Sequence, residues 1–201
     1  MSVILGFDIS SSVIGCCALK LDDNNKISLL ALEHINPIKT GHIIERLATT
    51  KEKVVEFINR IKPDYIGIED ILYFMRGKSQ AATTLTLAVF NRMVGLYAHE
   101  YLKKNPELFN VMSIRSGIKI NSFPKKEEIP ELVSSHLGIT FPYIKNKKGA
   151  IIIENYDRAD AAAVALYYAF ILTGKVKPKK PTVKRSKSKL ASIKKRKKSK
   201  K

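Results

Sequence analysis

The chain of 201 residues has no tryptophan and only two cysteines, Cys16 and Cys17, which are adjacent. Adjacent cysteines cannot build a disulfide framework, and no second Cys or His pair stands near them at zinc-site spacing. We therefore expect small core residues within a strand and an intracellular, reducing environment. No apolar run reaches the length of a membrane span and no signal peptide is apparent, so we expect a soluble protein without a membrane partner.

Acidic residues are missing from one end of the chain. Residues 175–201 hold 15 Lys and Arg and no Asp or Glu, which explains most of the net charge of +18. The other 21 basic and 18 acidic residues leave residues 1–174 nearly neutral. We therefore predict a globular domain over 1–174 and a disordered basic tail over 175–201. Nucleic acid is the expected partner, because lysines that reach phosphates release counterions; a solubilising or localisation tail is the alternative.

Short apolar runs and helical spacings alternate along residues 1–174. The short runs predict strands, the first three in a meander, over 3–7, 13–21, 27–35, 65–69 and 111–114. The helical spacings predict helices over 42–61, 79–102, 125–137 and 157–172. This order indicates an α/β fold, a five-stranded sheet with helices packed on its faces.

Four carboxylates stand where these elements end or begin. Asp8 and Glu69 each close an apolar strand, and Asp157 and Asp160 share one face of the last helix. If the two strands are parallel neighbours, all four can meet at one edge of the sheet. Crowded carboxylates need a counter-ion, and oxygen ligands favour Mg²⁺ or Mn²⁺. Two such ions, roughly 4 Å apart, can cleave a phosphodiester, so the sequence predicts a metal-dependent nuclease.

Each carboxylate also has a simpler structural interpretation. Asp8 could accept hydrogen bonds from the amides of Ser10 or Ser11 in a turn. Glu69 could mark the exit from a strand, and Asp157 could be an N-cap or first-turn acid of a helix. A purely structural role for all four together is the weaker interpretation, because the acids stand among apolar runs.

The same residues resemble a known family. Gly6-Phe7-Asp8-Ile9-Ser10 followed by Gly15, then Ile68-Glu69, then Asp157-Arg158-Ala159-Asp160-Ala161 resemble the RuvC-type Holliday junction resolvases of the ribonuclease H-like superfamily. The resemblance spans about residues 1–172 and implies a ribonuclease H-like mixed sheet. It implies a homodimer that cuts two opposed strands of a four-way DNA junction, leaving 5′-phosphate and 3′-hydroxyl ends. It also implies two magnesium ions, no organic cofactor, and the metal ligands Asp8, Glu69, Asp157 and Asp160.

The resemblance implies DNA contacts as well. The family wedges an aromatic residue into the junction centre shortly after the glutamate, and Tyr73 or Phe74 stands there, unless it packs in the core. The helix over 79–102 corresponds to the dimerisation helix. Candidate phosphate contacts are Arg76, Lys78, Lys119, Lys125 and Lys126. Glu154 competes with Asp157 for its role. The basic tail is unusual for bacterial members and suggests a phage or viral relative, acting in the host cytoplasm or nucleoid.

Three alternatives remain open from the sequence. A nuclease of the same fold could act on flaps, forks or structured RNA with identical carboxylates. A sugar kinase or actin-like ATPase shares an Asp-x-Ser-Ser-Ser loop, but needs two copies of the fold. A non-catalytic DNA-binding protein of this fold is disfavoured, because all four acids are retained.

Overall fold

Five strands form one mixed sheet in the computed structural model, which describes residues 1–71, 81–119 and 124–177. The strands are β1 Ser2–Ile9, β2 Ile14–Leu21, β3 Ile27–Ile35, β4 Tyr65–Glu69 and β5 Glu107–Phe109. Their order is β3-β2-β1-β4-β5, with β1–β2 and β2–β3 antiparallel and β1–β4 and β4–β5 parallel. The predicted meander and the parallel pairing of β1 with β4 are confirmed.

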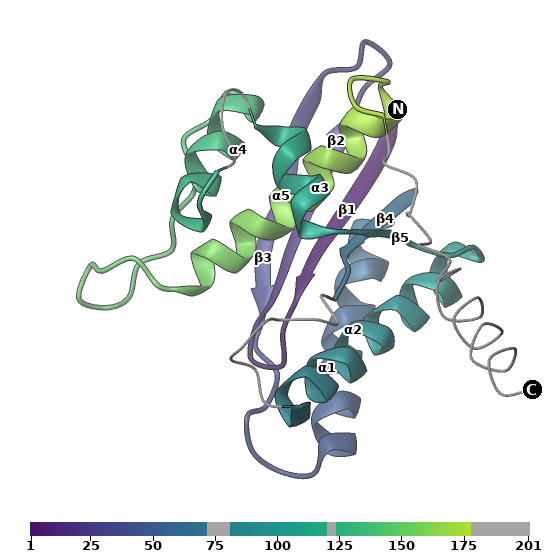
Figure 1. The fold of residues 1–201 in the computed structure, drawn as a ribbon, viewed down its shortest axis with the longest axis vertical. Coiled ribbons are helices and arrows are strands. Elements are labelled where there is room, and N and C mark those ends of the chain that lie inside the picture. The colour runs from purple at the N-terminus through teal and green to yellow at the C-terminus, as the bar shows by residue number, and fades with distance from the viewer. Residues whose placement is uncertain (72–80, 120–123, 178–201) are drawn as a thin grey trace, which may run out of the picture.

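Helices cover both faces of this sheet (Figure 1). One face carries α1 Ile43–Ile61 and α2 Ala81–Leu102. The other carries α3 Val111–Ile118, α4 Ile129–Leu137 and α5 Glu154–Leu172, and α5 packs directly on β1 and β2. A single 3-10 turn, Lys126–Glu128, leads into α4.

The alternation of side chains along β1 separates two cores. Leu5, Phe7 and Ile9 are buried against α1 and α2. Gly6 faces α5 instead, where a Cβ atom would lie 2.4 Å from a carbonyl oxygen of that helix. The glycine therefore lets the helix backbone approach the sheet, and Asp8, two residues on, points to the same side.

The prediction of a strand over 111–114 was wrong, because these residues begin α3 and the fifth strand is β5. Asn110 starts the helix, since its side chain accepts a hydrogen bond from the Met112 amide at 2.8 Å. The buried residues of α3 are Ile114 and Ile118. Their spacing of four residues is helical. Ile118 lies outside the apolar run 111–114, so that run alone does not show this spacing.

Other boundaries differ less from the predictions. The helix expected over 125–137 is divided into the 3-10 turn and α4, whose first turn contains Pro130. The last helix begins three residues earlier than predicted. Cys16 and Cys17 are buried in β2, as expected. Within the described ranges, no helix combines the length and apolarity needed to cross a bilayer.

Candidate active site

Asp8 is the penultimate residue of β1 and Glu69 the last residue of β4, its parallel neighbour. The register pairs Phe7 of β1 with Ile68 of β4, so the two carboxylates, one step further, are neighbours at the same edge of the sheet. Gly67 lies against α5, which places Glu69, two residues later, on the α5 face with Asp8. This arrangement is the one that the sequence predicted for the two strand-end acids.

Asp157 and Asp160 reach this edge from the first two turns of α5. Gly15, which pairs with Asp8 across β1 and β2, lies beneath the helix. A Cβ atom at residue 15 would lie 2.0 Å from the carbonyl oxygen of Asp157, so only glycine permits this approach. Because α5 begins three residues before Asp157, the N-cap interpretation of that residue was wrong, although it does lie in the first turn.

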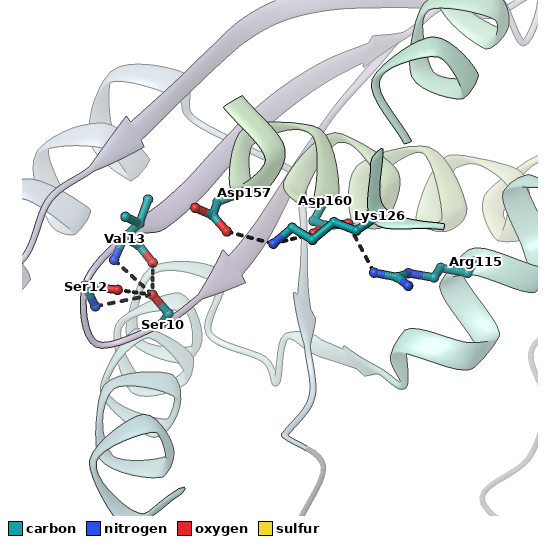
Figure 2. A network of polar contacts seen from close by, with 7 residues as sticks. All are labelled: Ser10, Ser12, Val13, Arg115, Lys126, Asp157 and Asp160. Carbon is teal, nitrogen blue, oxygen red and sulfur yellow. Dashed lines mark hydrogen bonds and ion pairs between the residues drawn. The ribbon is translucent and has the colours of Figure 1, made fainter. Parts of the chain in front are cut away.

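The turn after β1 is built by a serine. The Ser10 hydroxyl accepts hydrogen bonds from the amides of Ser12 and Val13 at 3.2 and 2.9 Å and donates to the Val13 carbonyl at 2.8 Å (Figure 2). The Asp8 carboxylate takes no part in these turn bonds. Its oxygen atoms are therefore available for another role.

The exit from β4 is likewise made by another residue. The Asp70 carboxylate accepts the Ile71 amide at 2.9 Å and pairs with Arg92 of α2 at 2.9 Å. Asn91, buried in α2, donates to the backbone carbonyl of Glu69 at 2.9 Å. The helix on the opposite face thus fixes the backbone of Glu69 while its side chain faces α5.

Burial and mutual repulsion favour protonation of these carboxylates. Desolvation raises the pKa of Asp8 well above its ordinary value, and the charges of Glu69, Asp160 and Asp157 raise it further. Desolvation, followed by the charge of Asp160, raises the pKa of Glu69 to about 7. Burial also raises the pKa of Asp160, against two nearby cations that lower it. The charges of these side chains therefore act on one another, as expected for strand ends that lie side by side beneath α5.

The two cations are Lys126 and Arg115 (Figure 2). The Nζ atom of Lys126 lies 3.1 Å from Asp157 Oδ1 and 3.2 Å from Asp160 Oδ2. The Nη2 atom of Arg115, on α3, lies 3.8 Å from Asp160 Oδ1. Partial burial lowers the pKa of Lys126, but the two aspartates outweigh it and raise the pKa overall, so this side chain stays charged.

Arg115 was missed in the sequence, where it fell just beyond the wrongly predicted strand. Its Nε atom is buried and has no hydrogen-bond partner within the described part of the chain. Lys126 was predicted to contact a DNA phosphate, and the structure places it on the carboxylates. Glu154 is not among the acids that act most strongly on Asp8, which favours Asp157 as the first acid of α5 in the cluster.

The remaining predicted DNA contacts are less closely tied to the cluster. Lys119 is exposed directly after α3, and Lys125 is exposed before the 3-10 turn, where its amide donates to Glu128 at 2.9 Å. The other four candidates fall outside the described residues: Tyr73, Phe74, Arg76 and Lys78.

The donor chemistry of the cluster fits a hard divalent cation. All four side chains offer carboxylate oxygens, and their repulsion favours a positive charge among them, a position that the Lys126 ammonium partly takes. As the side chains lie, the described residues hold no group of three or more His, Cys, Asp or Glu that is arranged to bind a metal. Binding would therefore require rearrangement of these side chains, including that of Lys126.

The sheet order, the helices on both faces and the acids at the ends of β1 and β4 define a ribonuclease H-like fold. The family model described as crossover junction endodeoxyribonuclease RuvC matches residues 4–168, and the chain belongs to this family. Family membership disfavours the sugar-kinase and actin-like alternative. The phage or viral origin stays a prediction.

Relatives and solved structures agree with this assignment. The chain is 25% identical over 164 residues to the RuvC endodeoxyribonuclease of Endomicrobium trichonymphae, covering 82% of this chain and 78% of the relative. It is 26% identical over 163 residues to that of Dehalococcoides mccartyi, covering 81% and 89%. Thermus thermophilus RuvC in complex with a Holliday junction substrate superposes with a TM-score of 0.66 at 21% identity, over 86% of this chain and 96% of that chain. The yeast mitochondrial resolvase Ydc2 gives 0.59 at 15% identity, over 83% and 77%.

Proposed function

We propose that this chain is a metal-dependent endonuclease that resolves four-way DNA junctions by phosphodiester hydrolysis. The observation that carries the proposal is the convergence of four carboxylates, three of them with raised pKa, at one edge of the sheet in a member of the RuvC family. Buried carboxylates that repel one another and have raised pKa values are typical of a functional site.

The proposed metal ligands are Asp8, Glu69, Asp157 and Asp160. Two magnesium ions bound there, for which Mn²⁺ can substitute, would activate a water molecule and stabilise the leaving 3′ oxygen. The chain itself fixes the ligands: Gly15 admits α5 against the sheet, and Asn91 holds the Glu69 backbone.

Lys126 and Arg115 are proposed to neutralise the carboxylates and then to contact the substrate phosphate. Both reach solvent, with side chains 43% and 20% exposed. A long cationic side chain that contacts two acids can turn to an arriving phosphate without leaving the site. Lys119 and Lys125 are proposed as further backbone contacts, because they are exposed on the two sides of the segment that precedes Lys126.

A homodimer is proposed as the active assembly, since symmetric cleavage of opposed strands needs two sites. Exposed apolar side chains on α2, such as Leu85 at 67% and Leu96 at 53%, offer a surface for a second copy. The predicted aromatic wedge after β4 stays a prediction.

The decisive test is cleavage of a labelled four-way junction in Mg²⁺, compared with linear duplex, flap and RNA–DNA hybrid controls. Wild-type protein should make paired symmetric nicks in the junction. Asp8→Asn should bind the junction but cut at least about 1000-fold more slowly, because one member of a group that acts as a unit is lost. Cleavage of flaps or hybrids alone would reassign the substrate, and binding without cleavage of any substrate would leave a DNA-binding protein.

The basic tail is proposed to add non-specific DNA affinity. The boundary predicted at residue 174 falls slightly early for a truncation, because the Val176 amide donates to the Phe170 carbonyl at 3.1 Å and Lys175 lies over the Phe170 ring. Truncation after Lys177 should weaken junction binding and flatten its salt dependence. A salt dependence equal to that of the full chain would reject this role.

A further inference from the structure

A short hairpin, residues 144–152, projects from the domain directly before α5 (Figure 1). Lys145 pairs antiparallel with Ile151, and the Ile152 amide donates to the Ile144 carbonyl at 3.1 Å. The hairpin contains no acidic residue. It carries three exposed lysines that make no ion pair within the described part of the chain: Lys145, Lys147 and Lys148.

The tip of the hairpin is a fixed turn. The Asn146 side chain accepts the amides of Lys148 and Ala150 at 2.9 and 3.1 Å. The backbone amide of Asn146 also donates to the Ala150 carbonyl at 2.8 Å. Gly149 has a φ of +80°, which favours glycine at this position. The lysines are therefore presented by an ordered backbone.

The base of the hairpin is tied to the catalytic helix by Asn155. This residue of α5 is fully buried, and its side chain accepts the Ile144 amide at 3.0 Å. Its Nδ2 atom donates to the carbonyls of Ile144 and Ile152 at 2.8 and 2.9 Å, so both sides of the hairpin are held. The first two turns of the same helix carry Asp157 and Asp160.

Arg158 strengthens this connection. Its guanidinium, 3% exposed, donates to the side chain of Asn155 and to the carbonyl of Pro142 at 3.0 Å. It also donates to the Leu32 carbonyl of β3 at 2.8 Å. The hairpin, the first turns of α5 and the sheet are thus joined by hydrogen bonds from two buried side chains. A displacement of the hairpin would disturb the helix that holds two of the carboxylates.

We infer that hairpin 144–152 is a phosphate-binding arm for the DNA duplex beside the cleaved bond. The position of the cleaved bond rests on the proposed function; the phosphate binding rests on charge and geometry alone. Four residues from base to tip extend about 13 Å, or about four base-pair steps of duplex. Three exposed ammonium groups on an ordered turn suit a row of phosphates, whose positions do not depend on base sequence.

Ile151 of the hairpin is 50% exposed, and Ile153, directly after the hairpin, is 73% exposed. Contact with a second protein chain is therefore the competing use of this surface. The three lysines beside these side chains favour DNA over an apolar protein contact, and the experiment separates the two because only phosphate contacts change the salt dependence of DNA binding.

The test compares two triple variants of the full chain. Lys145→Gln/Lys147→Gln/Lys148→Gln removes the hairpin charge. Lys20→Gln/Lys26→Gln/Lys62→Gln removes the same charge from the opposite end of β1 and β2, where Lys20 pairs with Val3, Lys26 precedes β3 and Lys62 ends α1. Dissociation constants for a four-way junction and a linear duplex are measured at several salt concentrations without metal, and thermal melting verifies that both variants fold.

The hairpin variant should bind at least about 10-fold more weakly at low salt, with a log–log salt slope reduced by about 2 to 3. The control variant should change the slope by less than about 1. The inference would be overturned if the hairpin variant kept the salt slope of the wild type, or if the control variant lost as much DNA affinity as the hairpin variant. A change of oligomeric state without a change in DNA binding would overturn it in favour of a protein contact.

A crosslinking measurement locates the arm directly. Lys147→Cys can carry a thiol-linked photo-crosslinker, since the native Cys16 and Cys17 are fully buried. Crosslinks should fall within a few nucleotides of the nicked position, unlike those of Lys62→Cys; identical patterns would contradict the inference. If the wild type cuts no junction but the hairpin variant loses its salt slope, the proposed function fails and the arm stands. Cleavage with an unchanged slope would reject the arm alone.

Discussion

The two faces of the sheet are packed by different means. On the α1 and α2 face, large side chains such as Phe7, Ile58 and Phe90 fill the space between sheet and helices. On the α5 face, Gly6 and Gly15 remove side-chain volume, so the helix backbone itself lies against the strands. The first arrangement produces a conventional core. The second brings carboxylates from two strands and one helix to one point.

This difference places the proposed metal ligands and the carboxylates with raised pKa on the same face. The α5 face holds the carboxylates whose pKa is raised by desolvation, whereas the other face contributes mainly apolar contact. Substitutions of these carboxylates should therefore change activity more than stability, or even improve stability. Substitutions on the α1 and α2 face should do the reverse.

Among substitutions that leave the four carboxylates in place, the largest effect is expected from Gly15→Ala. The added Cβ atom would lie 2.0 Å from the Asp157 carbonyl oxygen, so α5 must move. A displacement of about 1 Å in a catalytic group costs on the order of 100-fold in rate, and we expect at least this loss in single-turnover junction cleavage. Gly95→Ala is the matched control, because nothing lies within 4 Å of its Cβ position. Equal rates for the two variants would contradict the close-packing explanation.

The next largest effect is expected on the pH dependence of the unfolding free energy, measured without metal. A carboxyl group whose folded pKa exceeds its unfolded value stabilises the fold at low pH and loses that contribution as the pH rises through the folded value. For Glu69, with a pKa of about 7, the free energy of unfolding in EDTA should fall by on the order of 2–3 kcal/mol between pH 4 and 8.

Urea denaturation across this pH range measures the effect. Glu69→Gln should flatten the pH profile and be more stable than wild type at pH 8, and excess Mg²⁺ should flatten the wild-type profile by binding the folded state. Glu52→Gln, on the exposed surface of α1, is the charge-matched control. If the pH profile of the unfolding free energy of Glu69→Gln were identical to that of wild type, repulsion at Glu69 would not contribute to the stability of the fold.

The smallest effect is expected on the opposite face. Ile58 of α1 is 2% exposed, and Ile58→Val removes one methylene from that core. The variant should lose about 1 kcal/mol of unfolding free energy in urea denaturation. Its cleavage rate should stay within about twofold of wild type, because α1 contributes no carboxylate to the cluster. A large loss of activity in a folded variant would show that the two faces are not separable.

The chain positions of Asp8 and Glu69 could be predicted from sequence because each stands at the end of an apolar strand. Asp157 and Asp160 could be predicted from their spacing of three, which places both on one face of α5. A strand of apolar residues ends at Asp8 or Glu69 whatever the tertiary packing, and parallel neighbours align such ends. The contacts of Arg115 and Lys126 could not be predicted in this way. They depend on how α3 and the 3-10 turn fold back over α5. The sequence also predicts a strand at the start of α3, because the apolar run 111–114 is too short to contain the helical spacing of Ile114 and Ile118.

The hairpin before α5 illustrates the same limit. Its lysines are evident in the sequence, but its orientation depends on hydrogen bonds from the buried side chains of Asn155 and Arg158, two residues that lie within a helix. Polar residues inside a helix normally indicate an exposed face. Only the packing of α5 shows that these two are buried and hold a loop.

The most direct test of the carboxylate cluster is Mn²⁺ binding, measured by the electron paramagnetic resonance signal of the free ion. Wild-type protein and Ile58→Val should bind up to two ions per chain with equal affinity. Asp8→Asn should bind at least about 10-fold more weakly, because it removes a ligand at the centre of the cluster. Mn²⁺ binding by Asp8→Asn that equals the wild type would contradict the assignment of these four carboxylates as the metal site.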